Sequence, residues 1–170
     1  MSNPEVISVQ HNSISNDLLN EVIRIKSVAW DFPVDSQIKW IEENLKETDL
    51  HILLKVGGEF VAYLNLIDVS LFVDDVPIKA WGVGNVCAKI KGKGYGQLLM
   101  RKTNDLILEN ERIGLLFCKK ELDRFYSSCS WIKPIEGSVI IPHLKERLGT
   151  QVMMLNPPSF FILKYTEQLF

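Results

Sequence analysis

The chain has 170 residues, of which 46% are hydrophobic, so it is long enough to bury a core and is expected to form a single domain, 1–170. Its formal net charge of −2 argues against a general role in binding nucleic acid or membrane surfaces, because both partners select basic faces. No basic segment followed by a long apolar run opens the chain, and no stretch reaches membrane-spanning length, so we expect a cytoplasmic location.

The N-terminal part predicts one strand followed by two helices. The strand is expected over Glu5–Gln10, and Asn16 is expected to cap the first helix, which ends near Pro33. A second helix is expected from about Asp35 or Ser36. The apolar residues of each helix fall on one face, as expected for helices packed on a core: Leu18, Val22, Ile25 and Ala29 in the first, and Ile38, Ile41 and Leu45 in the second.

A run of strands follows the helices. His51–Val56 and Phe60–Asp68 flank the pair Gly57-Gly58, which is typical of the tight turn of a β-hairpin. A second turn at Asp74-Asp75 leads into a strand that ends around Val86.

The next stretch predicts an anion-binding loop. Gly92, Gly94 and Gly96 alternate with other residues between the strand end and a helix with an apolar stripe at Leu99, Thr103, Leu106 and Ile107. Glycines let backbone N–H groups approach a ligand, and a helix N-terminus adds unpaired donors and partial positive charge. Basic residues gather near this loop or at a strand end that follows it: Lys89, Lys91, Lys93, Arg101, Lys102, Lys119 and Lys120. A small phosphorylated ligand is therefore expected, although each lysine alone is equally consistent with a solvated surface.

The C-terminal part begins with the unbroken apolar run 113–118, which fits a strand covered on both faces, as in a parallel pair. Residues 83–118 therefore form a strand, helix, strand crossover. A short helix is expected over Lys120–Ser130, a strand over Trp131–Ile141, an irregular stretch around Asn156-Pro157-Pro158, and a strand-like segment over Phe160–Tyr165.

Three cysteines, Cys87, Cys118 and Cys129, lack the spacing of a metal site. Their odd number also gives no disulfide framework. All three stand in apolar contexts, where buried reduced thiols are expected. We expect no bound metal.

Two well-known phosphate-binding patterns do not fit the glycine loop. A nucleoside triphosphate P-loop requires lysine and then serine or threonine after its last glycine, whereas Gln97 follows Gly96 here. A dinucleotide-binding fingerprint has the spacing G-x-G-x-x-G, whereas this loop is G-x-G-x-G and lies in the middle of the chain.

The loop does resemble the coenzyme A loop of the GNAT N-acetyltransferase superfamily. That motif is [QR]-x-x-G-x-[GA], and the segment 91–96 reads K-G-K-G-Y-G, with Lys91 in place of glutamine or arginine. The segment 125–131, F-Y-S-S-C-S-W, resembles the family phrase FY-x-x-x-G-[FW], with Ser130 in place of glycine. The resemblance implies an α/β (α+β in some schemes) GNAT fold, with a mixed central sheet, helices on both faces and a central parallel crossover.

The resemblance also implies a site for acetyl-coenzyme A. Backbone N–H groups from Gly92 to Gln97 would hold the pyrophosphate, lysines would add charge, and the pantetheine arm would lie along the preceding strand end. The implied cofactor-binding residues are Val86, Cys87, Lys91, Gly92, Lys93, Gly94, Gly96 and Gln97.

The reaction implied is transfer of an acetyl group from acetyl-CoA to a primary amine of a small molecule by direct attack. By resemblance, the backbone N–H of Val86 stabilises the oxyanion and Tyr126 is the general acid that protonates the departing thiolate. Tyr126 also shares an apolar stripe with Leu122 and Phe125, so a core tyrosine is the alternative.

The chain departs from the family pattern where a base is often found. Many family members carry an acidic residue on the strand before the loop, but residues 81–84 read W-G-V-G, and Lys119 replaces a frequent asparagine. The replacement bases considered are Asp31, Asp35, Asp68, His51 and His143, each of which also suits an ordinary structural or surface role. The missing carboxylate motivates an alternative function, a coenzyme A binding or sensing module with little catalysis.

Substrate identity is weakly constrained by the sequence. Residues 117–126 and 131–142 are similar to the branch containing aminoglycoside 2′-N-acetyltransferases, although the acidic groups for a polycationic substrate are scattered: Asp31, Asp35, Glu42 and Glu43. A nicotinamide-dependent enzyme is a further alternative. These patterns do not specify the acceptor amine or the length of the acyl group. They do not specify the oligomeric state either, for which a homodimer is one alternative.

Overall fold

The computed structural model describes residues 3–170, and these form two compact units. The first unit consists of residues 3–67 and Gly84–Thr103, and the second consists of Asp68–Val83 and Asn104–Phe170. Two strands and one helix contribute to both units. The expectation of a single domain stays a prediction.

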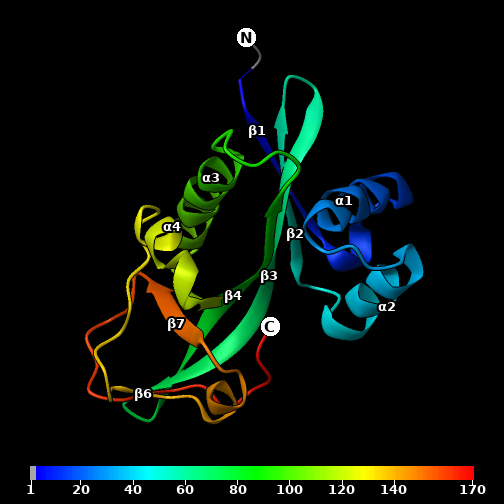
Figure 1. Ribbon diagram of the computed structural model, residues 1–170. Helices are drawn as coiled ribbons and strands as arrows, with labels where there is room; N and C mark the ends of the chain where they lie inside the picture. Colours follow the sequence, from blue (N-terminus) through cyan, green and yellow to red (C-terminus); the bar gives the residue numbers. More distant parts are fainter. Residues whose placement is uncertain (1–2) are drawn as a thin grey trace. The chain divides into compact units, whose positions relative to one another are not determined.

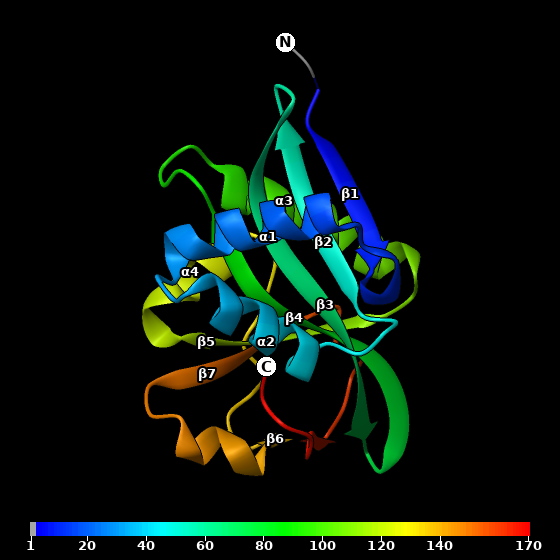
Figure 2. The same cartoon turned by 90° about the vertical axis from the view of Figure 1, so that its right-hand side faces the viewer.

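The first unit contains an antiparallel set of strands (Figure 2). Its strands are β1 (Glu5–Gln10), β2 (Leu50–Val56), the first part of β3 (Glu59–Val73) and the end of β4 (Val76–Ala88), neighbours in that order. The hairpin of β2 and β3 turns at Gly57 and Gly58, both with positive φ. In the β2–β3 register His51 lies opposite Asn65, so these two side chains share a face.

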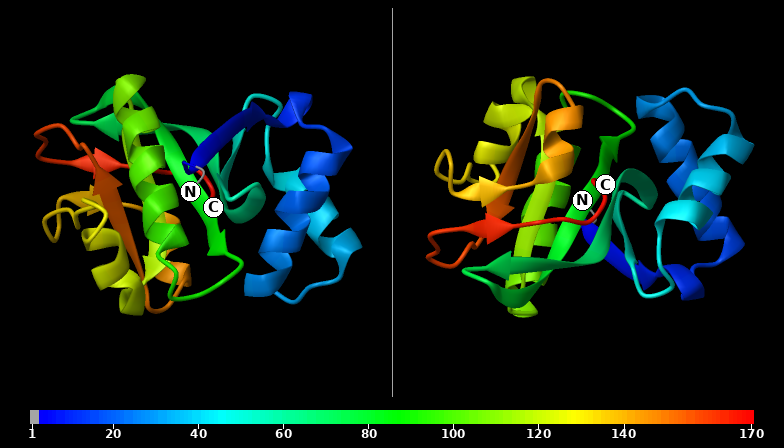
Figure 3. Two further views of the ribbon diagram at one scale, coloured as in Figure 1. Left: turned by 90° about the horizontal axis from the view of Figure 1, so that it is seen from above. Right: turned by 90° about the horizontal axis from the view of Figure 1, so that it is seen from below.

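Helices cover both faces of the first unit's strands (Figures 1 and 3). The helices α1 (Asn16–Ala29) and α2 (Val34–Asn44) lie together on one face, and the first part of α3 (Tyr95–Glu109) lies on the other. A 3-10 turn, η1 (His11–Ser13), leads into α1. The predicted Asn16 cap is wrong: Ser15 is extended and its Oγ accepts from the N–H of Leu18 at 3.2 Å.

The second unit contains the parallel pair. The first part of β4 pairs in parallel with β5 (Ile113–Lys119), with Ala80 opposite Ile113 and Val83 opposite Leu116. Because α3 connects β4 to β5, the predicted strand, helix, strand crossover is confirmed. On its other side β5 pairs antiparallel with β7 (Thr150–Leu155), so the sheet is mixed.

Shorter elements complete the second unit. The end of β3 pairs antiparallel with β8 (Leu163–Lys164), which pairs in parallel with β6 (Val139–Ile140). The other elements are η2 (Lys120–Leu122), α4 (Asp123–Ser127) and η3 (Pro142–Glu146).

The C-terminal expectations needed the most correction. The strand predicted over residues 131–141 is wrong, because Pro134 lacks an N–H and Gly137 has a φ of +82°; only β6 and a single bridge between Ile132 and Met154 form there. The helix predicted over residues 120–130 is shorter and follows a 3-10 turn, and Ser130 has a φ of +68°. The strand β7 was not predicted.

Each unit has its own buried apolar residues. Among the largest fully buried side chains, the first unit contains Ile25, Ile41, Ile52, Leu53, Leu54, Tyr63, Leu64, Leu66 and Leu99, and the second contains Leu71, Trp131 and Tyr165. The three cysteines are buried and free, which confirms the prediction for them. Within residues 3–170, no helix is long and apolar enough to cross a membrane.

Candidate active site

The glycine loop has a backbone that specifically requires glycine at two positions. Gly92 has a φ of +79° and Gly94 a φ of +75°, in the left-handed region that side chains with a Cβ rarely adopt. A Cβ at either position would meet nothing within 4 Å, so conformation and not crowding selects glycine. The helix α3 begins directly after the loop, and the N–H of Leu98 donates to the carbonyl of Gly94 at 3.0 Å.

The electrostatics of the loop favour an anion. The first turn of α3 contains no acidic residue, so its partial positive charge is not offset there. Lys91 and Lys93 are exposed and form no ion pair with another described residue. The left-handed glycine backbone, the open space where Cβ atoms would stand and the exposed Lys91 and Lys93 together fit a pyrophosphate.

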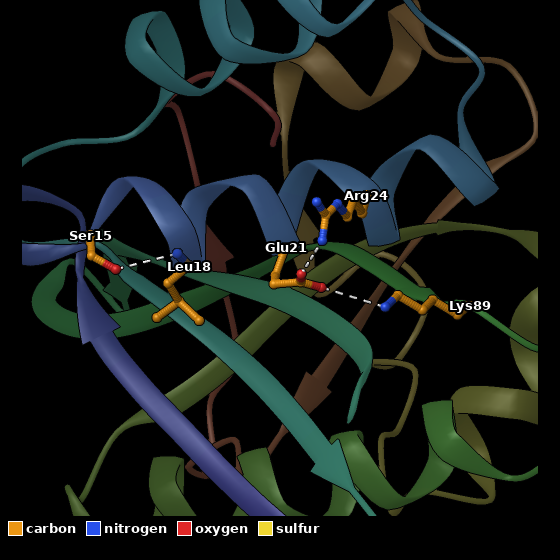
Figure 4. A network of polar contacts seen from close by, with 5 residues as sticks. All are labelled: Ser15, Leu18, Glu21, Arg24 and Lys89. Atoms are coloured by element: carbon orange, nitrogen blue, oxygen red, sulfur yellow. Dashed lines mark hydrogen bonds and ion pairs between the residues drawn. The ribbon is translucent and has the colours of Figure 1, made fainter. Parts of the chain in front are cut away.

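A third lysine near the loop is committed to a different partner. The Nζ of Lys89 lies 3.5 Å from Oε2 of Glu21 in α1, and Glu21 also pairs with Arg24 (Figure 4). This network links the end of β4 to α1, whose first turn is capped by Ser15. Lys89 therefore connects two elements of the first unit and is less available to a ligand than Lys91 or Lys93.

The end of β4 departs from a regular strand at Asn85. This residue has a φ of +54°, a left-handed conformation that is uncommon for a residue other than glycine and that interrupts the regular twist of the strand. Its Nδ2 donates to Oδ1 of Asn65 at 2.7 Å. Asn65 is fully buried and its own Nδ2 has no hydrogen-bond partner in the described chain. A Cβ on Gly84 would lie only 3.3 Å from the Asn65 amide, so a small residue is favoured before Asn85.

Val86 and Cys87 follow Asn85 and differ in exposure. Val86 is half-buried, whereas Cys87 is buried and its Sγ lies 3.8 Å from the carbonyl of Tyr63. Burial raises the pKa of the Cys87 thiol to about 12, so the thiol stays protonated at neutral pH. Cys87 therefore lines the strand end as a neutral group and is a poor nucleophile.

Buried polar side chains in the first unit form a hydrogen-bonded series that the sequence did not predict. Nδ1 of His51 lies 2.9 Å from the hydroxyl of Tyr63, and Nε2 of His51 lies 3.1 Å from Nδ1 of His11. His51 is fully buried, and burial, with smaller contributions from the charges of His11 and Lys26, lowers its pKa to about 4. Lys26 of α1 is also buried, and desolvation lowers its pKa from the ordinary 10.5 to about 8.

Tyr126 lies in α4 of the second unit. Its side chain is 7% exposed and packs edge-on against the ring of Phe125, with 4.9 Å between the centroids. Burial, followed by the neighbouring Cys118 and Cys129, raises the pKa of Tyr126 well above its ordinary value. Its hydroxyl makes no hydrogen bond with any other residue in the described range 3–170. The phenol is therefore protonated at neutral pH, and its hydroxyl has no hydrogen-bond partner among the described residues.

The chain is similar to known proteins in structure, and no match was found by sequence. No protein-family profile and no curated protein sequence matches the chain. Escherichia coli ElaA is 21% identical over 89% of this chain and 99% of that chain, with a TM-score of 0.62. An acyl-CoA N-acyltransferase from Pseudomonas aeruginosa is 16% identical over 89% and 99% of the two chains, with a TM-score of 0.61. A GCN5-related N-acetyltransferase from Kribbella flavida has 17% identity and a TM-score of 0.55, over 75% of this chain and 33% of that chain. The fold is the GNAT fold.

The second sequence phrase that suggested the GNAT fold has a structural role at Trp131. Its indole N–H donates to Oδ1 of Asn104 at 2.9 Å, and Nδ2 of Asn104 donates to the carbonyl of Cys129 at 2.7 Å. The backbone carbonyl of Tyr126 accepts from the N–H groups of Cys129 and Trp131. The aromatic at the end of the phrase therefore anchors the corner after α4.

The carboxylates and histidines considered as bases lie in varied surroundings. Asp31 and Asp35 are exposed, Oδ1 of Asp68 lies 2.7 Å from an Arg112 nitrogen, and His143 lies 3.8 Å from a Glu146 oxygen. His51 alone among these candidates belongs to the buried polar series of the first unit. Within the described residues, no group of three or more His, Cys, Asp or Glu side chains is arranged to hold a metal.

Proposed function

We propose that the protein is an acetyl-CoA-dependent N-acetyltransferase that acetylates a primary amine of a small molecule by direct attack. The observation that carries the proposal is the left-handed glycine loop at Gly92 and Gly94, which lies between the end of β4, where Asn85 has a positive φ, and the start of α3. The GNAT fold supports it, because the names of two of the similar structures describe transfer of an acyl or acetyl group to nitrogen.

The residues fit acetyl-CoA as follows. N–H groups of residues 92–97 would hold the pyrophosphate, with Lys91 and Lys93 supplying charge. Val86 and Cys87 would line the pantetheine arm, where the protonated thiol of Cys87 adds no competing nucleophile. Acetyl-CoA supplies an acyl group activated as a thioester.

Two groups are proposed to act on the reacting atoms. The backbone N–H of Val86 follows the left-handed Asn85, and we assign it to the developing oxyanion. Tyr126 is assigned as the general acid, because its raised pKa keeps the proton on the phenol until a thiolate departs.

A second candidate function is a coenzyme A binding or sensing module with little catalysis. It is favoured by the absence of a carboxylate at residues 81–84, where W-G-V-G offers no acidic side chain. A nicotinamide-dependent enzyme is the third candidate and predicts stabilisation by NAD(P) instead of coenzyme A.

Binding and transfer separate these candidates. Acetyl-CoA should raise the Tm of the protein and NAD(P) should not; the reverse result would favour the nicotinamide enzyme. Radiolabel should then move from acetyl-CoA to members of a panel of alkylamines, aromatic amines and one aminoglycoside, the last because of the sequence similarity of residues 117–126 and 131–142. A Tm shift without labelled amine would favour the binding module.

Replacing Gly94 by alanine should weaken acetyl-CoA binding. The substitution strains a φ of +75° by about 1 kcal/mol, which corresponds to about a fivefold loss of affinity if the strained loop moves away from the ligand. Gly57→Ala is the matched control, because it strains a φ of +62° in the β2–β3 turn without altering the loop. Equal acetyl-CoA affinity in both variants, measured by calorimetry, would remove the loop from the binding site.

Replacing Tyr126 by phenylalanine should lower kcat by about 10²-fold at neutral pH while acetyl-CoA affinity is retained. Tyr165→Phe is the control, since it removes another second-unit hydroxyl, which donates to the carbonyl of Gln168 at 2.7 Å. Unchanged turnover in Tyr126→Phe would leave Tyr126 as a core tyrosine.

A further inference from the structure

Two asparagine side chains pair across neighbouring strands of the first unit. Nδ2 of Asn85 in β4 donates to Oδ1 of Asn65 in β3 at 2.7 Å. Asn65 is 0% exposed, as are Leu64 and Leu66 on either side of it, whereas Asn85 is half-buried. The accepting end of this hydrogen bond is therefore shielded from water, and hydrogen bonds in a low-dielectric interior are stronger than exposed ones.

Gly84 gives the Asn65 amide room and also confines it. A Cβ at position 84 would lie 3.3 Å from both Oδ1 and Nδ2 of Asn65, closer than most Cβ contacts in proteins. Gly84 has no left-handed φ, in contrast to Gly92 and Gly94, so close approach is the reason for a glycine at this position. The Asn65 amide thus lies against the backbone of β4 directly before Asn85, to which it presents a fixed acceptor.

The backbone conformation of Asn85 depends on this acceptor. Its φ of +54° is unfavourable for a residue with a Cβ, and asparagine is among the few residue types that adopt it, because its side chain can form compensating hydrogen bonds. The bond to Asn65 is such a bond, and its contribution is similar in size to the backbone strain. Without it, Asn85 would return toward the extended conformation of a regular strand.

The conformation of Asn85 also sets the direction of the next N–H group. The peptide unit that joins Asn85 to Val86 is planar, so it turns as a whole when the dihedral angles of Asn85 change. The N–H of Val86 belongs to this unit and is the group assigned above to the developing oxyanion. An oxyanion donor is effective when its direction is fixed before the charge develops, because no energy is then spent on reorienting it.

Resting on the proposed N-acetyltransferase function, we propose that Asn65 is a positioning residue for the oxyanion donor. Its Oδ1 holds Asn85 in the left-handed conformation, and Asn85 in turn directs the N–H of Val86 toward the carbonyl oxygen of the thioester. Asn65 is fully buried and touches neither acetyl-CoA nor the acceptor amine. Its contribution is therefore expected in kcat and not in the affinity for acetyl-CoA, which the glycine loop supplies.

The first measurement compares Asn65→Leu with the wild type. Leucine has the same branched shape without the acceptor, and it also removes the Nδ2 group that has no partner among the described residues, so the variant is expected to fold. Removal of an oxyanion donor lowers kcat by about 10²- to 10³-fold, and a donor that is only misdirected should lose about tenfold. Thiol release from acetyl-CoA with the panel of amines defined above gives kcat, and the acetyl-CoA affinity by calorimetry should stay within about twofold of the wild type.

The second measurement separates positioning from a general structural role by changing Asn85. Asn85→Ala removes the same bond at its half-buried end and should also lose about tenfold in kcat. Asn85→Gly should lose only about threefold, because glycine enters the left-handed region without help. In the Asn85→Gly background, Asn65→Leu should change kcat by less than about twofold, since no side chain is left for Asn65 to hold. The two single variants of Asn85 test the bond even if Asn65→Leu does not fold.

Gln37→Met is the matched control. Gln37 is another buried amide of the first unit, 3% exposed, and its Nε2 donates to the carbonyl of Trp30 and to Oγ of Ser27. The control should keep the wild-type kcat and acetyl-CoA affinity.

The outcomes distinguish the positioning role from the proposed function. If Asn65→Leu keeps the wild-type kcat, or lowers it by the same factor in the Asn85→Gly background, the positioning role is overturned and the proposed function survives. The same conclusion follows if Asn85→Gly is as impaired as Asn85→Ala. If the wild type fails to bind acetyl-CoA, or binds it without acetylating any amine, the proposed function is overturned and the positioning role with it.

Discussion

Lys26→Met should make the protein more stable, which is unusual for the replacement of a buried residue. The ammonium of Lys26 has left water without gaining a carboxylate, and its lowered pKa measures the cost of that transfer. A methionine of similar length should fill the space between α1 and the strands without this cost.

The magnitude follows from the pKa. A decrease from 10.5 to about 8 corresponds to about 3 kcal/mol of lost stability at neutral pH, at about 1.4 kcal/mol for each pKa unit. The variant also loses the contact of the Lys26 ammonium with the Trp40 ring, which lowers its stability by about 1 kcal/mol. We therefore expect Lys26→Met to raise the free energy of unfolding by about 2 kcal/mol.

The sign of the pH dependence gives a sharper test. Between pH 8 and 10.5 the unfolded chain binds more protons at this residue than the folded chain, so the stability of the wild type rises with pH in that window. The difference between variant and wild type should thus be largest below about pH 8 and should shrink toward pH 10.5. Urea unfolding of both proteins at about pH 7 and pH 10 measures it, and other titrating groups cancel in the comparison. A variant less stable than the wild type, or a constant difference across the two pH values, would refute the reasoning.

Two further predictions concern stability. The folded state keeps His51 neutral with a pKa of about 4 against the ordinary 6.5, so the free energy of unfolding should fall by about 3 kcal/mol as the pH drops through that window, and urea titrations should show this loss removed in His51→Gln. Gly114→Ala should destabilise the protein by about 3 kcal/mol, because its Cβ would lie 2.5 Å from the indole of the buried Trp131. Gly82→Ala should cost less, although its Cβ would overlap the Phe170 ring, because Phe170 is half-buried and its ring can shift toward solvent more readily than the buried indole of Trp131; equal Tm values for the two variants would contradict the assignment of Gly114.

The sequence predicted the first half of the fold well because its elements are sharply bounded. Gly57-Gly58 and Asp74-Asp75 are turns whose residues have positive φ in the structure, so the strands between them could be counted correctly. The error at the start of α1 was one residue, because Ser15 and Asn16 are both good capping residues and only the backbone conformation distinguishes them.

The C-terminal part was harder because its strands depend on partners far away in the chain. The segment 150–155 reads T-Q-V-M-M-L, which lacks the alternation of a half-exposed strand, and it becomes β7 by pairing with β5. The strand predicted over residues 131–141 failed because Pro134 and Gly137 interrupt the ladder. Pairing with β5 therefore overrode local propensity in β7, whereas local backbone constraints prevented the strand over residues 131–141.

The candidate site was predicted where its residues are close in sequence. Gly92 and Gly94 predict a loop in which φ is positive, and φ is positive at both residues in the structure. The roles of Val86 and Tyr126 stay predictions, since both rest on the resemblance. The buried polar series could not be read from the sequence, because His11, His51 and Tyr63 come together only through β-sheet pairing.

One signal for Lys26 was nevertheless present in the sequence. The stripe of α1 places residues 22, 25, 26 and 29 on one face, and a lysine within that set contradicts the pattern of its neighbours. Such a contradiction between a residue and the pattern of its neighbours is the reason for expecting Lys26→Met to stabilise the protein. The glycine loop is a feature of local sequence and identifies a ligand class shared by many proteins. The burial of Lys26, by contrast, comes from the packing of α1 against Trp40 of α2, which no local pattern in the sequence specifies.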